Sequence, residues 1–285
     1  MKYDPVPLGT ICKRVLSGGT PKSTISDYYD GGIPWLNTKE VHFNRIYRTE
    51  RTISELGLNN SAAKWIAPHS VVVAMYGATA GNVAVNLNPL TTNQACCNLE
   101  INEAKADYRY IYYYLKSQYR KLSSLANGGA QQNLNAQLIK SFEIFLPKLE
   151  VQREIADILW TLDDKIEQNS KINDNLQQQA FAFFDRLMIE ADNDDCTVSE
   201  YADLNSRRVL AKHQIARSID MSQLSTSGAF PSGWEMKPFN GGMRFTNGDT
   251  LLARITPCLE NGKTAFIDFV DEGEVGFGST EHIVP

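Results

Sequence analysis

The sequence predicts an α+β fold in three parts. Residues 1–150 form a domain with a curved mixed or antiparallel sheet and short helices, residues 151–190 form a long coiled-coil helix, and residues 191–285 form part of a second, similar domain. Three observations predict this order: short apolar runs split by turn residues, a helical segment without Gly or Pro, and a strand pattern that occurs twice. A chain of 285 residues is long enough for two domains.

The elements of the first part follow from local patterns. Apolar runs at residues 71–75, 82–85 and 95–101 are bounded by Gly, Asn and Thr and are typical of strands. A helix is expected over Tyr108–Leu125, because apolar residues recur there at intervals of three and four.

The second part carries a heptad pattern. Apolar residues at alternating intervals of four and three predict a coiled-coil seam with one pair of Asn on it: Ile155, Leu159, Leu162, Ile166, Asn169, Asn173, Leu176, Ala180, Phe183 and Leu187. About 40 helical residues span about 60 Å, which exceeds the diameter of a 150-residue domain. The alternative, an amphipathic helix that lies on its own domain, is therefore less favoured.

The third part repeats the first. Residues 72–77 and 81–85 resemble residues 251–256 and 262–266, which places the repeat at an offset of 179 residues that becomes 181 after the loop. Residues 35–41 align with 218–224, and Thr92–Ala95 aligns with Ser279–His282. Three matches in the same order predict a duplicated domain.

Composition and charge exclude several classes of protein. The chain has no apolar run of roughly 18 residues and no apolar segment near its start, which excludes a membrane span and a secretory signal. Five cysteines without a regular spacing indicate reduced thiols and a cytoplasmic protein. Residues 1–150 hold 16 Lys and Arg against 11 Asp and Glu, whereas residues 151–285 hold 12 against 22. The basic first part is compatible with contact to phosphates.

The sequence shows no catalytic constellation and no metal site. Cys96 and Cys97 are adjacent, so in a strand they point to opposite faces and cannot bind one metal together. Gly262-Lys263-Thr264 resembles the end of a phosphate-binding loop, but the position of its leading Gly is Pro257, and a hairpin tip is favoured instead.

Four loops are rich in Gly and in side chains that form hydrogen bonds or stack. Gly allows close approach to a groove, Lys and Thr suit phosphate oxygens, and Asn and Gln suit base edges. The residues expected to bind DNA are Thr20, Lys22, Ser23, Trp35, Asn37, Thr38, Lys39, Tyr76, Thr79, Asn82, Gln131, Gln132 and Asn133. Each loop alone is better explained as an ordinary solvated turn, but together they suggest a DNA-reading surface on each copy of the domain.

At this point the chain resembles the DNA specificity subunit of type I restriction-modification systems. Ser17-Gly18-Gly19-Thr20-Pro21, with Gly32-Ile33-Pro34-Trp35-Leu36 after it, is similar to the opening of that family's target-recognition domain. The most specific part is Phe145-Leu146-Pro147 followed by Gln152-Arg153-Glu154-Ile155-Ala156-Asp157-Ile158-Leu159, which resembles the entry into the family's helical spacer.

The resemblance implies two target-recognition domains, each reading half of a bipartite site in double-stranded DNA, and two spacer helices packed antiparallel. It implies a subunit without catalytic activity or a cofactor of its own. Its partners would be methyltransferase subunits, which bind S-adenosylmethionine, and a restriction subunit that uses ATP and Mg.

Compared with that pattern, the chain lacks the end of the second recognition domain and the second spacer. A truncated subunit is therefore expected, with a homodimer through the seam as one way to cover the spacer helix. The apolar residues of that interface are Ile155, Leu159, Leu162, Ile166, Leu176, Phe183 and Leu187. The alternative function is that of a decoy or inhibitor, which binds the methyltransferase without reading DNA properly.

Overall fold

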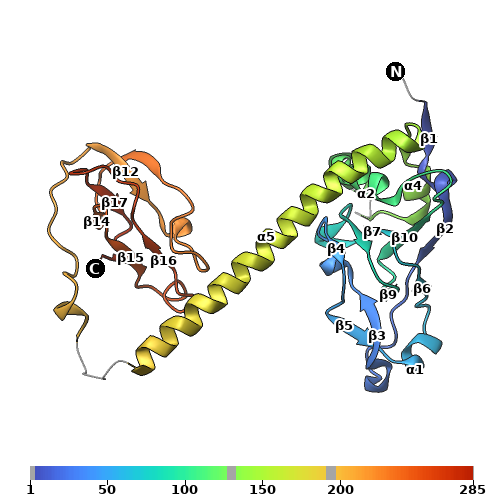
Figure 1. The fold of residues 1–285 in the computed structure, drawn as a ribbon, viewed down its shortest axis with the longest axis horizontal. Helices are drawn as coiled ribbons and strands as arrows, with labels where there is room; N and C mark the ends of the chain where they lie inside the picture. Colours follow the sequence, from blue (N-terminus) through green and yellow to red (C-terminus); the bar gives the residue numbers. More distant parts are fainter. Residues whose placement is uncertain (1–3, 127–132, 191–196, 285) are drawn as a thin grey trace. The chain divides into compact units, whose positions relative to one another are not determined.

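The computed structural model describes residues 4–126, 133–190 and 197–284. The chain divides into two compact units, Met1–Phe183 and Phe184–Pro285, and each is described by itself. In the described residues, the first unit holds three sheets, four short α-helices and most of a long α-helix, and the second holds two smaller sheets. Figure 1 shows these elements. The α+β class expected from the sequence is confirmed.

The larger sheet of the first unit has the strand order β2-β10-β7-β8-β4 and is antiparallel except for the pair β4–β8. Its strands are β2 (Cys12–Ser17), β10 (Cys96–Ile101), β7 (Val71–Ala74), β8 (Val83–Asn86) and β4 (Arg45–Ile46). The strands expected at residues 71–75, 82–85 and 95–101 are therefore present as β7, β8 and β10.

A second sheet has the order β5-β3-β9-β6, and a third pairs β1 with β11. These strands are β5 (Arg51–Ile53), β3 (Tyr29–Leu36), β9 (Leu90–Thr92), β6 (Trp65–Ile66), β1 (Pro5–Pro7) and β11 (Glu143–Phe145). The short helices are α1 (Glu55–Asn59), α2 (Tyr108–Ser117), α3 (Tyr119–Ala126) and α4 (Ala136–Ser141). The single helix expected over Tyr108–Leu125 is thus two helices, because the backbone leaves the helical conformation at Gln118.

The larger sheet is buried on both faces. Val71 and Val73 of β7 pack in the cluster that contains Ile111 of α2, whereas Val72 and Ala74 pack in a separate cluster with Leu36. This explains why β7 is a continuous apolar run without polar alternation. Cys96 and Cys97 lie in the two different clusters, as expected for neighbours in a strand.

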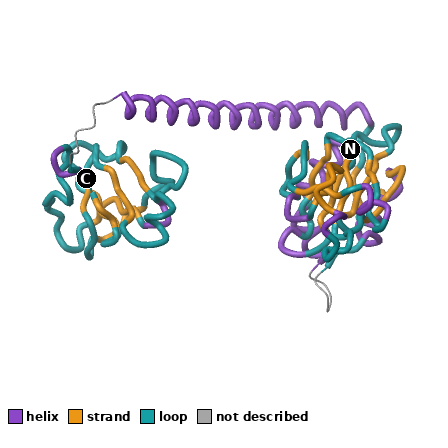
Figure 2. Tube along the Cα trace, turned by 90° about the horizontal axis from the view of Figure 1, so that it is seen from below, coloured by secondary structure: helices purple, strands orange, loops and turns teal. Residues whose placement is uncertain are grey.

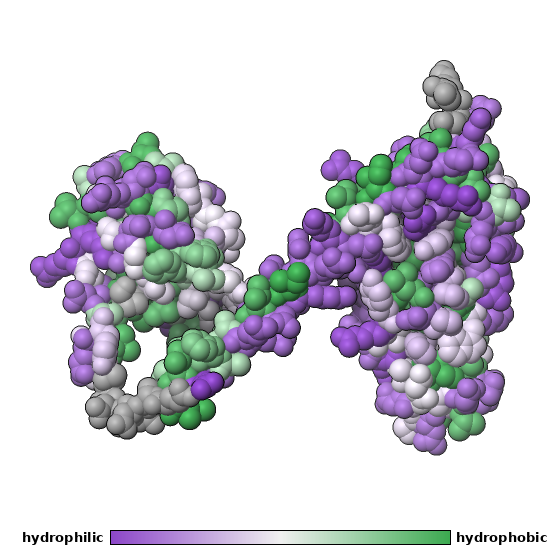
Figure 3. All heavy atoms as spheres, in the orientation of Figure 1, coloured by the Kyte–Doolittle hydropathy of each residue, from purple (hydrophilic) through white to green (hydrophobic). Residues whose placement is uncertain are grey.

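The long helix α5 (Leu149–Glu190) is a single uninterrupted element of 42 residues, or about 63 Å (Figure 2). Its first turns dock on the first unit through Gln152 and Ala156, which are fully buried. The residues of the heptad seam lie on a different face. Apart from the half-buried Leu159 and the small Ala180 and Asn residues, they are large apolar side chains with 39% to 65% of their surface exposed. Figure 3 shows hydrophobic residues at the surface of the helix.

The second unit repeats the topology of the first. Its four-stranded sheet has the order β13-β12-β17-β14, with β12 and β17 parallel and the two outer pairs antiparallel, as in β5-β3-β9-β6. Its second sheet, β16-β15-β18, corresponds to β8-β7-β10. The strands are β12 (Ile215–Ile219), β13 (Glu235–Pro238), β14 (Arg244–Phe245), β15 (Thr250–Ala253), β16 (Thr264–Phe266), β17 (Gly276–Gly278) and β18 (His282–Ile283).

Strand register supports the repeat and corrects one alignment. Ala74 pairs with Cys96 as Ala253 pairs with His282, so Asn93, and not Thr92, corresponds to Ser279. The reason is the turn before each strand: the side-chain oxygens of Asn93 and Ser279 both accept from the backbone N–H two residues later. Among the described residues, no strand of the second unit corresponds to β2 or β4.

Because of His282, we expect the second unit to lose stability in acid. Its imidazole is 1% exposed, neither ring nitrogen has a hydrogen-bond partner, and burial lowers its pKa to about 4 although Asp220 acts in the opposite direction. The pKa of His282 in the folded protein lies below the usual 6.5. Its neutral imidazole therefore contributes fully to the stability of the second unit above pH 6.5, and this contribution is lost as the pH falls towards 4. We expect the free energy of unfolding of the second unit to fall by roughly 3 kcal/mol between pH 6.5 and pH 4.

Denaturant unfolding followed by tryptophan fluorescence measures this pH dependence in the transition of the second unit, which holds Trp234, whereas the other three tryptophans lie in the first unit. His282→Leu should flatten the curve between pH 6.5 and 4. The control is His213→Asn, because His213 is exposed and has a φ of 67°, which Asn tolerates, and its curve should keep the wild-type shape. Equal pH dependence in wild type and His282→Leu would contradict the assignment.

Candidate nucleic-acid interface

Three loops and one short segment of the first unit come together although they are distant in the sequence. We call them the loop cluster: residues 18–23 after β2, 37–40 after β3, 76–82 between β7 and β8, and 93–95 between β9 and β10. Hydrogen bonds join them directly: Gly19 N to Thr92 O (2.9 Å), Asn93 N to Leu36 O (2.9 Å), Met75 N to Ala95 O (2.8 Å) and Thr79 Oγ1 to Thr38 O (3.1 Å). Three of the four expected loops therefore form one surface, and the fourth, at residues 127–133, lies almost entirely outside the described residues.

Two glycines make the close contact within the loop cluster possible. A Cβ atom on Gly18 would lie 2.0 Å from the carbonyl oxygen of Thr92, and one on Gly19 would lie 2.2 Å from the backbone of Ala62. No other residue type fits at these positions without moving the backbone.

Several of the expected DNA-binding side chains are exposed on the loop cluster: Thr20, Lys22, Ser23, Lys39 and Tyr76. Lys39 forms an ion pair of 2.5 Å with Glu50, and its hydrogen bond to that carboxylate raises the pKa of Lys39. Lys22, in contrast, forms no ion pair with a described residue. Asn133 is also exposed, and its neighbour Leu134 donates to Met75 O (3.0 Å), beside Tyr76.

Other expected residues position the loops. Trp35 and Asn82 are only 3% and 8% exposed, and their side chains donate to Gly19 O and Val41 O, both at 2.9 Å. The Asn37 side chain caps the turn at residues 38–40, and Thr38 and Thr79 are half-buried. These side chains support the loops of the cluster, and contact between any of them and DNA stays a prediction. Gln131 and Gln132 lie outside the described residues.

Gln94 is a residue of this surface that the sequence analysis missed. It is exposed at the centre of the segment that links β9 to β10, and its Oε1 accepts a hydrogen bond from Thr20. The signal for it in the sequence is the polar run at residues 91–94, whose first two residues end β9 and whose last two precede β10.

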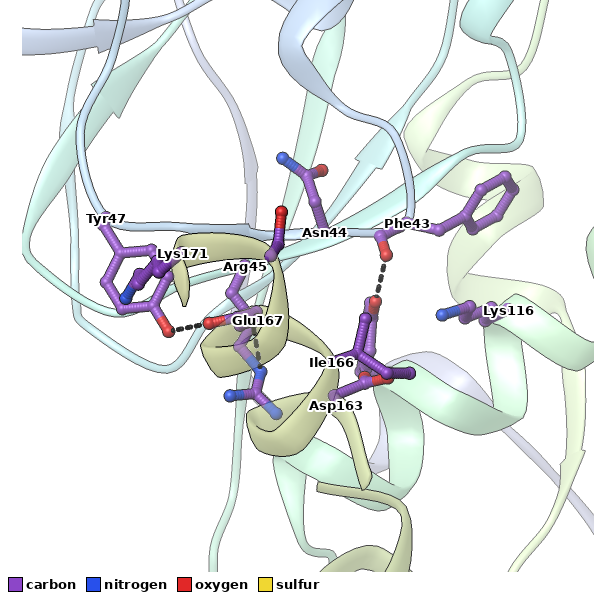
Figure 4. Close-up of a pocket in the computed structure, with 11 residues that line it drawn as sticks. Phe43, Asn44, Arg45, Tyr47, Lys116, Asp163, Ile166, Glu167 and Lys171 are labelled. Carbon is purple, nitrogen blue, oxygen red and sulfur yellow. Dashed lines mark hydrogen bonds and ion pairs between the residues drawn. The ribbon is translucent and has the colours of Figure 1, made fainter. Parts of the chain in front are cut away.

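A second cluster of contacts lies where α5 crosses the first unit. Phe43, Tyr47, Tyr112 and Ile166 line an open groove of about 550 Å³, with Lys116 and Lys171 at its rim (Figure 4). Beside it, the guanidinium of Arg45 lies 3.8 Å from the Trp160 ring and forms ion pairs with Asp164 and Glu167. Burial disfavours the charged form of this guanidinium and lowers its pKa. The pKa of Arg45 nevertheless stays above its ordinary value, because hydrogen bonds to Asp164 and Tyr47 and the negative charge of Glu167 favour the charged form.

Among the described residues, the structure shows neither a metal-binding group nor a reactive thiol at Cys97. They contain no group of three His, Cys, Asp or Glu side chains that could hold a metal ion. Burial raises the pKa of the Cys97 thiol to about 12, so this thiol is not a nucleophile. No helix in the described part of the chain is long and apolar enough to cross a membrane.

Comparison with known proteins identifies the family. Residues 2–178, the first unit with most of α5, match the model of the type I restriction modification DNA specificity domain. The chain belongs to this family. Type I specificity subunits are non-catalytic and bind no cofactor themselves, so the expectation that the chain is not an enzyme is confirmed at the level of the family.

Two curated relatives give the extent of the similarity. The MjaIX specificity subunit of Methanocaldococcus jannaschii is 27% identical over 258 residues, which are 89% of this specificity chain and 54% of the relative. The EcoR124I/EcoR124II specificity subunit of Escherichia coli is 26% identical over 60% of this chain and 44% of its own length. The chain thus spans about half the length of these relatives.

A solved structure confirms the fold. The crystal structure of a type I restriction-modification S subunit from M. genitalium has a TM-score of 0.61 and 18% identity, and the match covers 100% of this chain and 72% of that one. The similarity extends over both units and α5.

Proposed function

We propose that the first unit reads one half of a bipartite site in double-stranded DNA through the loop cluster. The observation that carries this proposal is the convergence of three distant loops and the 93–95 segment on one surface, joined by backbone hydrogen bonds. Exposed Lys22 and Lys39 provide charge for phosphates, while Gln94 and Asn133 provide amides for base edges.

The same proposal assigns partners. The chain docks methyltransferase subunits, which supply S-adenosylmethionine chemistry, and through them a restriction subunit that uses ATP and Mg. The second unit reads the other half-site, in keeping with its repeated sheet topology. The complex works in the cytoplasm, where its DNA is located.

The exposed seam of α5 fits a second, antiparallel helix. When the chain is paired with a second copy about a two-fold axis at Lys171, Ile155 faces Leu187, Leu159 faces Phe183, and Ile166 faces Leu176 of that copy. The two seam asparagines, Asn169 and Asn173, then face each other, as buried polar residues that specify register do. We propose that the purified 285-residue chain forms this homodimer.

A gel-shift assay tests the DNA-reading proposal. The chain with its methyltransferase subunits should bind a selected duplex at least ~10³-fold more tightly than random duplex of the same length. Binding to the methyltransferase without this preference would contradict the proposal and support the decoy alternative.

Lys22→Ala and Lys39→Ala should weaken binding to all duplexes equally. Each removes one phosphate contact, so the slope of log K against log salt should fall by about 1 per substitution. The pair of Lys39 with Glu50 is exposed and therefore weak enough to be exchanged for a phosphate. Lys13→Ala, which lies at the opposite end of β2, serves as the matched control. Unchanged slopes for both variants would place the phosphate contacts elsewhere.

A further inference from the structure

Helix α5 is tied to the first unit at two places along its length. The first is near its start, where Gln152 accepts from Asp107 N (3.0 Å) and donates to Pro147 O (2.7 Å). Arg109 also pairs there with Asp157 at 2.6 Å. The second lies one to three turns further along, at residues 160–167, and is centred on Arg45 of β4. Two separate contact sites, which we call the first and second tie, fix the direction of the helix, whereas a single contact site would let the helix tilt about that point.

Arg45 makes most of the contacts of the second tie. Its side chain is 3% exposed, stacks on Trp160, donates to Trp160 O (2.8 Å) and forms ion pairs with Asp164 and Glu167. A planar guanidinium can stack and donate in several directions at once, which an ammonium group cannot. Tyr47 and Tyr113 complete the tie through Glu167 (2.6 Å) and Asp163 (2.7 Å).

The length of the helix amplifies any change in its direction. About 40 Å of helix separate Ile155 from Phe183. A tilt of ~10° about the first tie would displace the far end by ~7 Å, or roughly two base-pair steps of DNA.

We propose that Arg45 is a positioning residue that fixes the direction in which α5 leaves the first unit, and with it the number of base pairs allowed between two half-sites. The structural half of this inference stands on the contacts of the first unit alone. The half that concerns DNA spacing rests on the proposed function.

The structural half is tested by the distance distribution between spin labels at exposed Asn59 and Gln178, attached by chemistry that spares the native cysteines. Arg45→Met should widen this distribution, and Arg45→Lys should restore part of the wild-type width. Arg14→Met is the matched control, because Arg14 also pairs with a carboxylate, Glu100, and donates to a carbonyl, Trp65 O, but does not contact α5. Thermal unfolding identifies a variant that fails to fold. In that case Tyr47→Phe, which removes only a hydroxyl from the second tie, should still widen the distribution.

The DNA half is tested with selected half-sites placed one base pair closer or further apart than the optimum. Wild type in its methyltransferase complex should discriminate by ~10-fold or more, and Arg45→Met by less than ~3-fold, with unchanged preference within each half-site. A folded Arg45→Met variant with the wild-type distance distribution overturns the positioning role. A widened distribution with unchanged spacing preference overturns the link to DNA. If no complex prefers any duplex, the proposed function fails, while the distance measurement still decides the role of Arg45.

Discussion

Leu162→Asp is expected to convert the purified chain from a dimer into a monomer. Leu162 lies in the seam of α5 and is 55% exposed, so the described residues do not cover it completely. Burying a Leu side chain contributes about 1.5–3 kcal/mol, and a carboxylate in its place adds a desolvation cost of several kcal/mol. The dimer should therefore dissociate at least ~10³-fold more readily.

Sedimentation equilibrium at micromolar concentration measures this effect. Gln168→Asp is the matched control, because Gln168 is exposed on the face of α5 that points away from the seam. A wild-type monomer, or a Leu162→Asp variant with the mass of the wild type, would show that the seam does not bind a second copy.

Gly18→Val is expected to disrupt the loop cluster and abolish specific DNA binding. A Cβ atom at this position would lie 2.0 Å from the carbonyl oxygen of Thr92 and 2.2 Å from its side-chain Oγ1, so the end of β9 must move away from residue 18. We expect the first unit to lose about 3 kcal/mol of stability and the affinity to fall to that for random DNA. Denaturant unfolding and gel shifts measure the two effects. Gly233→Ala, at a position with open space around it, should change neither, and wild-type affinity in Gly18→Val would contradict the role of this contact.

Local patterns were sufficient to predict much of the fold. Strands β7, β8 and β10, the length of α5 and the repeated domain follow from runs and periods that depend on neighbouring residues. The break at Gln118 and the one-residue shift at Asn93 were not predictable in this way, because hydrogen bonds outside a simple period set both.

The site was predicted at the level of loops and less well at the level of side chains. Composition identified the loops, but Trp35 and Asn82 are buried because segments distant in the sequence fold over them. Arg45 was missed for the same reason, since its partners Trp160 and Asp164 are 115 and 119 residues away. A polar residue reveals its role only when its burial and its partners are known.

The most direct test of the DNA-reading proposal is a selection experiment. The chain, in complex with its methyltransferase subunits, selects the duplexes that it binds from a random library. Wild type, Gln94→Ala and Gly18→Val are compared. We expect one enriched motif for wild type. Gln94→Ala should lose its preference at a single base pair, a change of about 1–3 kcal/mol. Gly18→Val should enrich no motif. The same enriched motif for all three proteins, or no motif for wild type, would contradict the claim that the loop cluster reads DNA.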